Sequence, residues 1–257
     1  MTLQFSIHYR AIFGQSVYVS IRFFTNEGRM LEHAVALHTE DGDRWTGETQ
    51  GVVGHHRLRF MTYSYQLRDG KGKVCRKEWD AVPRCCILTA GRSYYFQDIW
   101  RDLSVVRYLF PKSDRPRYPL RDIPSFCRSV IFRVSAPHVD DNHSVAILGS
   151  DPVLGDWNEA HYLLLHYIGD GDWALPINAQ ALKLPFSFKY VVVDNETRDV
   201  VEWESGWNRE LDVDEIKNGM QLVIYGGNVR TKALLTYSDE LLGEQHSIEH
   251  EISDLYI

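Results

Sequence analysis

Tryptophan and lysine side chains with hydrogen-bonding neighbours gather at three places in the second half of the sequence. The segments are LGSDPVLGDWN at 148–158, FKY at 188–190 and WESGWNR at 203–209. The chain also contains 7 Trp and 14 Tyr in 257 residues, and most of these rings are expected in the core. A flat ring can cover apolar C–H groups while polar neighbours hydrogen-bond to the edge of the same ligand. The pattern favours a ligand with one apolar face and a polar edge.

The sequence shows no motif for catalysis or for a bound nucleotide. A phosphate-binding loop, a nucleophile elbow, an HExxH motif and an HCxxGxxR arrangement do not occur in it. Asp170 and Asp172 lie beside Trp173, but a GDGDW turn explains them more simply than a pair of glycosidase carboxylates. We therefore predict no catalytic residue and no cofactor.

The histidines do not form a recognisable metal motif. No set of spaced Cys or carboxylate ligands accompanies either pair, His55 with His56 or His161 with His166. Surface or loop histidines are the simpler interpretation, and we predict no metal site.

The charge of the chain excludes some classes of partner. Its formal net charge is -7 and its pI is near 5.9. Non-specific binding to nucleic acid or to anionic lipid requires a basic face, so we predict neither partner. The ligand is expected to be neutral or small.

Targeting signals and cysteine usage indicate a cytoplasmic protein. The N-terminus, MTLQFSIHYRAIFG, lacks a basic region followed by an apolar one, and no stretch approaches the roughly 20 apolar residues of a membrane span. The four cysteines show no CxxC spacing, and the vicinal pair is awkward for a simple bridge. We predict thiols at Cys75, Cys85, Cys86 and Cys127.

One pattern of landmarks occurs twice in the chain. Aligning Trp45 with Trp173, Tyr65 with Tyr190 and Trp79 with Trp203 leaves only small differences in loop length. Runs of Val, Tyr, Phe and Ile are bounded by turn sequences such as DGKG at 69–72 and DNET at 194–197. A repeat of this length is a domain duplication. We predict an all-β protein of two antiparallel, immunoglobulin-like β-sandwich domains in tandem.

The domain boundaries follow from composition. We place the first sandwich at 1–100 and the second at 127–225. The segment 101–126 contains LFPKSDRPRYPLRDIPS, whose prolines and charges predict a linker. The segment 226–257 is an acidic tail, in which Ile248, Ile252 and Leu255 share one face of a possible helix.

The three motifs of the second copy, in this order and spacing, resemble the starch-binding domain of carbohydrate-binding module family 20. The resemblance implies that Trp157 and Trp203 form two tilted rings on which successive glucose units of an α-1,4-glucan stack. It also implies that Lys189, Glu204 and Asn208 hydrogen-bond to the sugar hydroxyls as donor, acceptor and two-way amide. The ligand would be starch, glycogen or maltodextrin.

A second sugar site of this family lies on the opposite side of the sandwich. Tyr167 and Trp173 could supply its rings, although Trp173 could equally be a strand residue that packs against its neighbour.

The first copy departs from the family pattern. It lacks an LGDW equivalent, Ser64 replaces the lysine, Asp80 replaces the glutamate, and only Trp79 survives of the platform. We expect its primary site to be weak or absent. Trp45, with nearby Tyr18, could keep a contact like that of the second sugar site, and a structural or spacing role is the alternative.

The tandem arrangement also resembles the opening of disproportionating 4-α-glucanotransferases of glycoside hydrolase family 77. That resemblance implies a covalent or separate catalytic domain, which would follow and is absent from this sequence. We therefore expect non-catalytic glucan binding by this chain. The alternatives are a fragment named after a transferase parent and a structural or dimerisation module.

Overall fold

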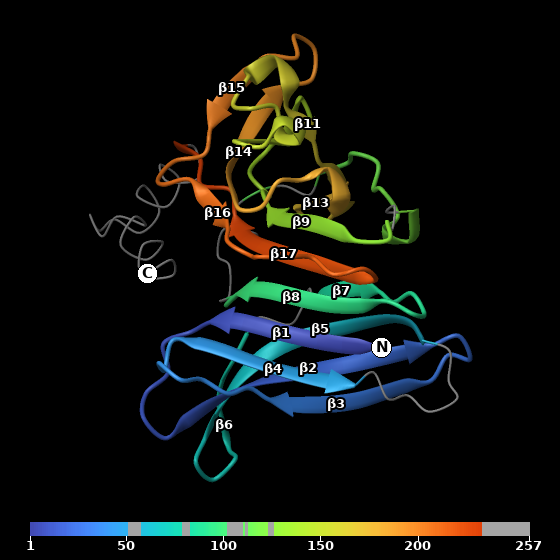
Figure 1. The fold of residues 1–257 in the computed structure, drawn as a ribbon, viewed down its shortest axis with the longest axis vertical. Coiled ribbons are helices and arrows are strands. Elements are labelled where there is room, and N and C mark those ends of the chain that lie inside the picture. Colours follow the sequence, from blue (N-terminus) through green and yellow to red (C-terminus); the bar gives the residue numbers. More distant parts are fainter. Residues whose placement is uncertain (51–57, 79–82, 102–109, 111–112, 123–125, 233–257) are drawn as a thin grey trace. The chain divides into compact units, whose positions relative to one another are not determined.

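The computed structural model describes residues 1–50, 58–78, 83–101, 110, 113–122 and 126–232. Every element with assigned bounds is a strand or a short 3-10 helix, which confirms the predicted all-β class (Figure 1). Parts of the predicted linker and most of the predicted tail, including Ile248, Ile252 and Leu255, lie outside the described residues. The same holds for His55, His56, Trp79 and Asp80.

The chain divides into two compact units. The first contains residues 1–104 and 219–225, and the second contains residues 105–218 and 226–257. Strand β17 spans Met220–Asn228. Its residues 220–225 belong to the first unit, and its residues 226–228 belong to the second.

The first unit contains two sheets. One sheet has the order β3-β2-β5-β6, and β7 also pairs with β5. In the other, β1 pairs with β4 antiparallel and with β8 in parallel, and Met220–Ile224 of β17 adds to β8 in parallel. The strands are β1 Thr2–His8, β2 Gln15–Thr25, β3 Met30–Ala36, β4 Arg44–Gln50, β5 Leu58–Asp69, β6 Val74–Lys77, β7 Arg84–Ile87 and β8 Ser93–Ile99.

The second unit repeats this plan. One sheet has the order β11-β10-β14-β15 with β16 beside β14, and the other contains β12, β13 and β9. The strands are β9 Ser129–Ser135, β10 His143–Gly149, β11 Leu163–Leu164, β12 His166–Gly169, β13 Asp172–Asn178, β14 Phe186–Asp194, β15 Val200–Trp203 and β16 Arg209–Leu211. Four 3-10 helices lie between strands, at Leu120–Asp122, Pro152–Leu154, Glu159–His161 and Ala179–Ala181.

The predicted turn sequences form the hairpins β5–β6 and β14–β15. The Oδ1 atom of Asp69 accepts hydrogen bonds from the backbone N–H groups of Lys71 and Lys73, both at 2.9 Å. The Oδ1 atom of Asp194 similarly accepts from Glu196 and Thr197, both at 2.8 Å. In each turn an aspartate side chain satisfies backbone donors that the ladder leaves open.

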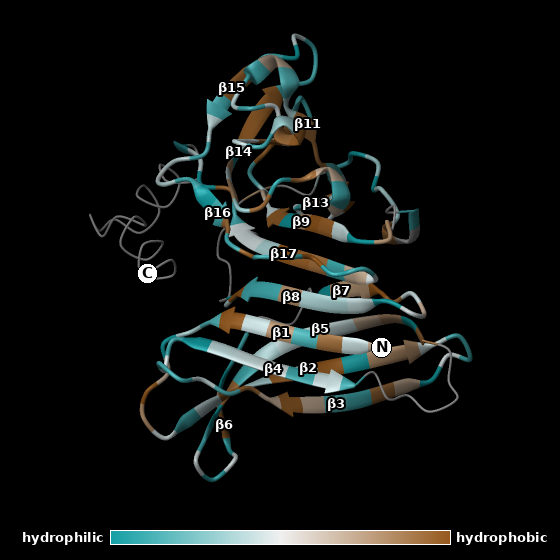
Figure 2. Cartoon of the chain, viewed as in Figure 1, coloured by the Kyte–Doolittle hydropathy of each residue, from teal (hydrophilic) through white to brown (hydrophobic). Residues whose placement is uncertain are grey.

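Alternating apolar residues build the core of each unit. In β2, Val17, Val19 and Ile21 are fully buried while the residues between them are more exposed, as period-2 side-chain alternation requires. Strand β14 differs, because the run Tyr190–Val193 is buried on both faces. Figure 2 shows the resulting hydrophobic run along β14. An apolar layer therefore also lies on the outer face of this sheet.

Strand register confirms the duplication. Trp45 lies opposite Ile7 in the first unit, and Trp173 lies opposite Val134 in the second. Both tryptophans are buried. They occupy matching strands, β4 and β13.

A buried glutamate and arginine fix the β5–β6 edge of the first unit. The backbone N–H of Glu78 donates to the Tyr65 carbonyl at 3.0 Å, and the Glu78 carboxylate accepts from the Tyr65 N–H at 2.8 Å. Arg84 pairs with the same carboxylate at 2.5 Å and reaches Asp98 at 3.2 Å. Burial raises the pKa of Asp98.

The second unit contains the same arrangement around Glu204. Its backbone N–H donates to the Tyr190 carbonyl at 3.0 Å, and its carboxylate accepts from the Tyr190 N–H at 3.4 Å. Arg209 pairs with that carboxylate at 2.5 Å, and Arg230 pairs with the same carboxylate at 3.3 Å. Glu78 is thus the counterpart of Glu204, and Arg84 is the counterpart of Arg209.

These equivalences correct the sequence alignment of the two copies. Trp203 pairs with Val191 on β14, and the matching residue on β6 is Lys77, which pairs with Gln66. The alignment of Trp79 with Trp203 was therefore wrong by two residues. The first copy keeps the glutamate, as Glu78, and has lost the tryptophan.

We predict that Arg84→Met lowers the free energy of unfolding of the first unit by about 3–5 kcal/mol, because it leaves buried carboxylates without their cation. Urea denaturation followed by circular dichroism measures this change. Arg22→Gln is the control, since Arg22 pairs with Glu32 at the surface and exposed pairs contribute about 0–1 kcal/mol. Equal stability losses in the two variants would contradict the structural role of the buried pair.

Candidate functional site

Trp157 and Trp203 come together on the second unit, as the sequence predicted for a platform. Their ring centroids are 6.3 Å apart and their planes are inclined by 35°. Both rings are half-buried, so each keeps an accessible part. Trp203 comes from the end of β15, and Trp157 comes from the loop after β10.

The backbone of the loop at 149–158 folds back so that Trp157 lies beside the end of β10. Asp151 is buried, and its carboxylate accepts from the Val153 N–H at 2.8 Å and the Lys183 N–H at 2.7 Å. Gly155 has a φ of 86°, in the left-handed region that glycine adopts without strain. The Trp157 N–H then donates to the Gly149 carbonyl at 3.0 Å. The conformation follows from the GSDPVLGDW sequence.

An apolar base supports both indoles. It consists of buried side chains on the two central strands of the sheet, Ala146, Leu148, Val191 and Val193. Trp157, Trp203, Tyr162 and Val200 pack against it. This packing explains why β14 is buried on both faces, and it holds the rings in place.

A hydrogen bond also orients the indole of Trp203. Its Nε1–H donates to Oε1 of Glu159 at 2.7 Å. Glu159 lies two residues after Trp157, so the loop that supplies one ring also positions the other. Glu159 could not be predicted from the sequence, because nothing in its local pattern distinguishes it from a surface carboxylate.

Lys189 lies beside the loop at 204–208. Its Nζ atom donates to the backbone carbonyls of Glu204 at 3.0 Å and Gly206 at 2.7 Å. These bonds fix the ammonium group, which has three donors in total. Asn208 is exposed in the same loop. Both residues are compatible with contact to a ligand on the adjoining surface.

Glu204 has a different environment from the one expected for a sugar acceptor. It is 2% exposed, and its carboxylate is occupied by Arg209 and Arg230. Burial alone would raise the pKa of Glu204, but the two arginines outweigh it and hold the pKa below its ordinary value. We therefore assign Glu204 a positioning role, because its carboxylate is held inside the protein.

Tyr167 and Trp173 are also buried, at 9% and 2% exposure. Their rings meet edge to face, with centroids 5.3 Å apart, and the Arg115 guanidinium lies 4.6 Å from the Trp173 centroid. The alternative interpretation of Trp173 as a packed strand residue fits this arrangement. The rings do not offer open faces for a second sugar site.

Trp207 was missed by the sequence analysis. It is 91% exposed and stands between Gly206, which accepts from Lys189, and Asn208. An indole this exposed leaves its ring open for contact with a ligand. The signal was present in the motif WESGWNR, whose second tryptophan has no place in the strand pattern.

The described residues contain no cluster of three or more His, Cys, Asp or Glu side chains that could hold a metal ion. Across the same residues, no helix combines the length and the apolar character needed to cross a membrane. The four cysteines are thiols, as predicted.

Comparison with known families identifies the second copy. Residues 128–222 match the family model of the starch binding domain of carbohydrate-binding module family 20. The match lies within the second copy and confirms the resemblance found in its motifs.

The chain is also related to 4-alpha-glucanotransferase DPE2 of rice, Oryza sativa subsp. japonica. The two are 26% identical over 236 residues, which cover 83% of this chain and 24% of the rice protein. The chain thus spans about a quarter of the length of this relative.

Solved structures of starch-active enzymes are similar over parts of the chain. The family 20 module of the maltotetraose-forming amylase from Pseudomonas saccharophila is 21% identical, with a TM-score of 0.30, and covers 38% of this chain and 98% of its own. The glucoamylase of Hypocrea jecorina is 19% identical, with a TM-score of 0.33, over 47% of this chain and 22% of that one.

We predict that Gly155→Ala destabilises the second unit by about 1–2 kcal/mol or more, since a left-handed backbone is costly for alanine. A Cβ atom there would also lie 2.7 Å from the His161 carbonyl oxygen. Urea denaturation measures the change. Gly42→Ala is the control, because its φ is 84° and its Cβ would meet nothing within 4 Å. A loss no larger than in this control would contradict the tight packing of the loop.

Proposed function

We propose that the chain binds α-1,4-glucan without catalysis, through a platform made by Trp157 and Trp203 on the second unit. The observation that carries this proposal is the tilted pair of half-buried indoles, 6.3 Å apart, on an apolar base. The match of residues 128–222 to the starch-binding family model supports the proposal. The physiological glucan would be starch, glycogen or maltodextrin.

The ring arrangement suits the shape of the ligand. A glucose unit has C–H groups on its faces, and these groups can lie on an indole while the hydroxyls stay at the edge. The 35° inclination lets successive units of a curved α-1,4 chain each meet one ring. The platform is formed by packing within the protein, so little rearrangement accompanies binding.

The polar residues divide into two groups in this proposal. Lys189 and Asn208 hydrogen-bond to sugar hydroxyls, with the ammonium as donor and the amide as donor and acceptor. Glu204 acts indirectly, because its pairs with Arg209 and Arg230 hold the loop that carries Asn208. Trp207 adds a third ring at the end of the platform.

The relationship to the rice protein suggests where this binding operates. That protein is named a 4-alpha-glucanotransferase, and the chain matches 24% of its length. We propose that the chain is the glucan-binding part of such a transferase and acts in the cytoplasm. A covalent or separate catalytic domain would receive the glucan held by the platform, and the purified chain would not convert maltooligosaccharide.

We predict that the chain is retarded in native gels containing amylose or glycogen, and that Trp203→Ala or Trp157→Ala removes most of the retardation. The affinity should fall by about tenfold or more, because each variant loses the apolar contact of one ring. Mobility against glucan concentration gives the dissociation constant. Phe13→Ala is the control, since Phe13 is fully exposed on the first unit. Unchanged retardation of both tryptophan variants would reject the platform.

A smaller effect is expected at Trp207. Trp207→Ala should weaken retardation by roughly twofold to fivefold, because a loop ring that lacks a packed base gains less from stacking. The stability of this variant should equal that of the wild type, as the side chain is exposed. Retardation of the variant as strong as that of the wild type would show that Trp207 does not contribute to glucan binding.

A further inference from the structure

The face of the first unit that corresponds to the platform has a different chemistry. Strand register gives each counterpart: Gln66 on β5 stands at the place of Val191, and Ser64 stands at the place of Lys189. Lys77 stands at the place of Trp203. The loop that carries Trp157 has no counterpart, because β2 runs directly into β3.

All four side chains of the apolar base differ in the first unit. The members of the base, Ala146, Leu148, Val191 and Val193, correspond by register to Tyr18, Ser20, Gln66 and Arg68. The Arg68 guanidinium lies 4.3 Å from the centroid of the Tyr18 ring. Hydroxyl, amide and cationic groups thus occupy every position of the base except the one held by Tyr18.

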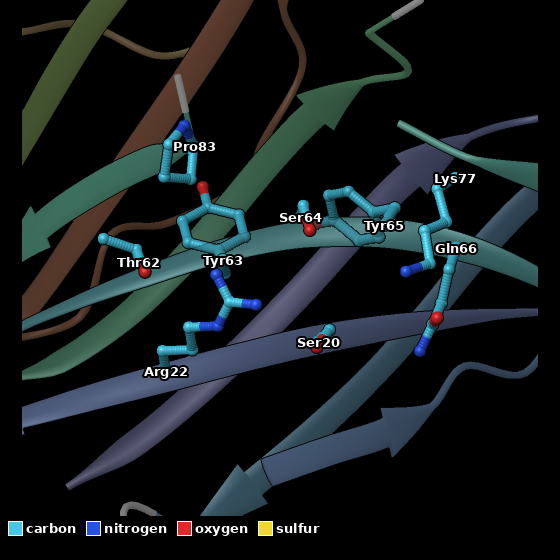
Figure 3. A pocket seen from close by; sticks show the side chains of 9 residues that line it. All are labelled: Ser20, Arg22, Thr62, Tyr63, Ser64, Tyr65, Gln66, Lys77 and Pro83. Carbon is cyan, nitrogen blue, oxygen red and sulfur yellow. The ribbon is translucent and has the colours of Figure 1, made fainter. Parts of the chain in front are cut away.

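Ser20 and Gln66 of this set line a groove across β2, β5 and β6, together with Arg22, Thr62, Ser64 and Lys77. Figure 3 shows Arg22 and Lys77 towards its two ends, with the hydroxyls of Ser20 and Ser64 between them. Thr62 and Gln66 continue the polar row along β5. The groove offers donors and acceptors over its length and a cation towards each end.

The groove is held on a rigid frame. Beneath Ser64 and Gln66, Tyr65 is fully buried and bonded to Glu78, which pairs with Arg84. The same frame underlies the platform of the second unit. The backbone geometry of a sugar-binding face has therefore been kept while its side chains have changed.

The charged side chains that line the groove, Arg22 and Lys77, are both cationic although the chain is acidic. Arg68 lies on the same face. Arg22 pairs with Glu32 at 2.9 Å, and both side chains are about half exposed. Exposed pairs of this kind contribute little and are readily exchanged for another anion. Lys77 is exposed.

From this face we infer that the first unit binds a phosphorylated sugar, with Arg22 and Lys77 available to the phosphate ester and Ser20, Ser64 and Gln66 to the sugar hydroxyls. Guanidinium and ammonium groups make charge-assisted hydrogen bonds to phosphate, and hydroxyl and amide groups match the edge of a sugar. The ester could be on a free monosaccharide or on a glucan chain. This inference does not depend on the aromatic platform.

The test is calorimetric titration of the full chain with glucose 6-phosphate, with glucose and inorganic phosphate as reference ligands. Glucose 6-phosphate should bind more tightly than either reference. Lys77→Met should weaken this binding roughly tenfold, since it removes one charge-assisted contact. Lys71→Met is the matched control, because it removes the same charge from an exposed residue of the β5–β6 turn, away from the groove lining.

Three outcomes would overturn the inference. They are no heat of binding with glucose 6-phosphate, equal affinity in the Lys77→Met and Lys71→Met variants, and equal affinity for inorganic phosphate and the sugar phosphate. Trp203→Ala should leave the titration unchanged, and loss of binding in that variant would place the anion on the second unit. The last comparison also separates this site from the platform, where Trp203→Ala is expected to remove most of the binding of neutral glucan.

A gel-retardation experiment distinguishes a phosphate ester on a free monosaccharide from one carried on a glucan chain. Phosphorylated amylopectin is compared with the same polymer after phosphatase treatment, using retardation of the wild type and of Lys77→Met. A difference between the two polymers that disappears in the variant supports a phosphate carried on glucan. Binding of glucose 6-phosphate without such a difference supports the free monosaccharide.

Discussion

The buried pair of a glutamate and an arginine is the interaction on which both units depend. In the second unit, Glu204 bonds to the backbone of Tyr190 and to Arg209 and Arg230, so it joins β14 to the segments that follow Trp203. A buried charge without its partner is costly, whereas the complete pair defines one register. Because strand register determines which side chains share a face, this pair also determines where the platform forms.

The buried pair keeps the backbone of the domain the same while the side chains on its surface differ between the two copies. Glu78 and Arg84 make the same contacts in the first unit, although Lys77 replaces the tryptophan next to the glutamate. The outer side chains can change without a change of backbone, since the buried contacts lie on the opposite side of the strand. This separation explains how one duplicated fold can present an aromatic platform in one copy and a polar groove in the other.

The sequence predicted the all-β fold and the duplication, because strand periodicity and the order of landmarks are local signals. The proximity of Trp157 to Trp203 was predicted from the resemblance to a known family. The sequence did not predict that Glu204 points inward, since burial depends on Arg209 and Arg230 folding back onto it. The alignment error at Trp79 has a similar origin. Two tryptophans next to glutamate or aspartate look equivalent in one dimension, and only strand pairing distinguishes them.

The contact between the two indoles and the apolar base has a consequence for the kinetics of recognition. The rings form the outer layer of a small hydrophobic cluster, and this packing within the protein orients them. A polymer that arrives at such a surface loses its own conformational freedom but requires none from the receptor. Under the proposed function, association can occur at many equivalent points along a glucan, and dissociation can be fast. Such a unit would suit repeated short encounters along a long chain.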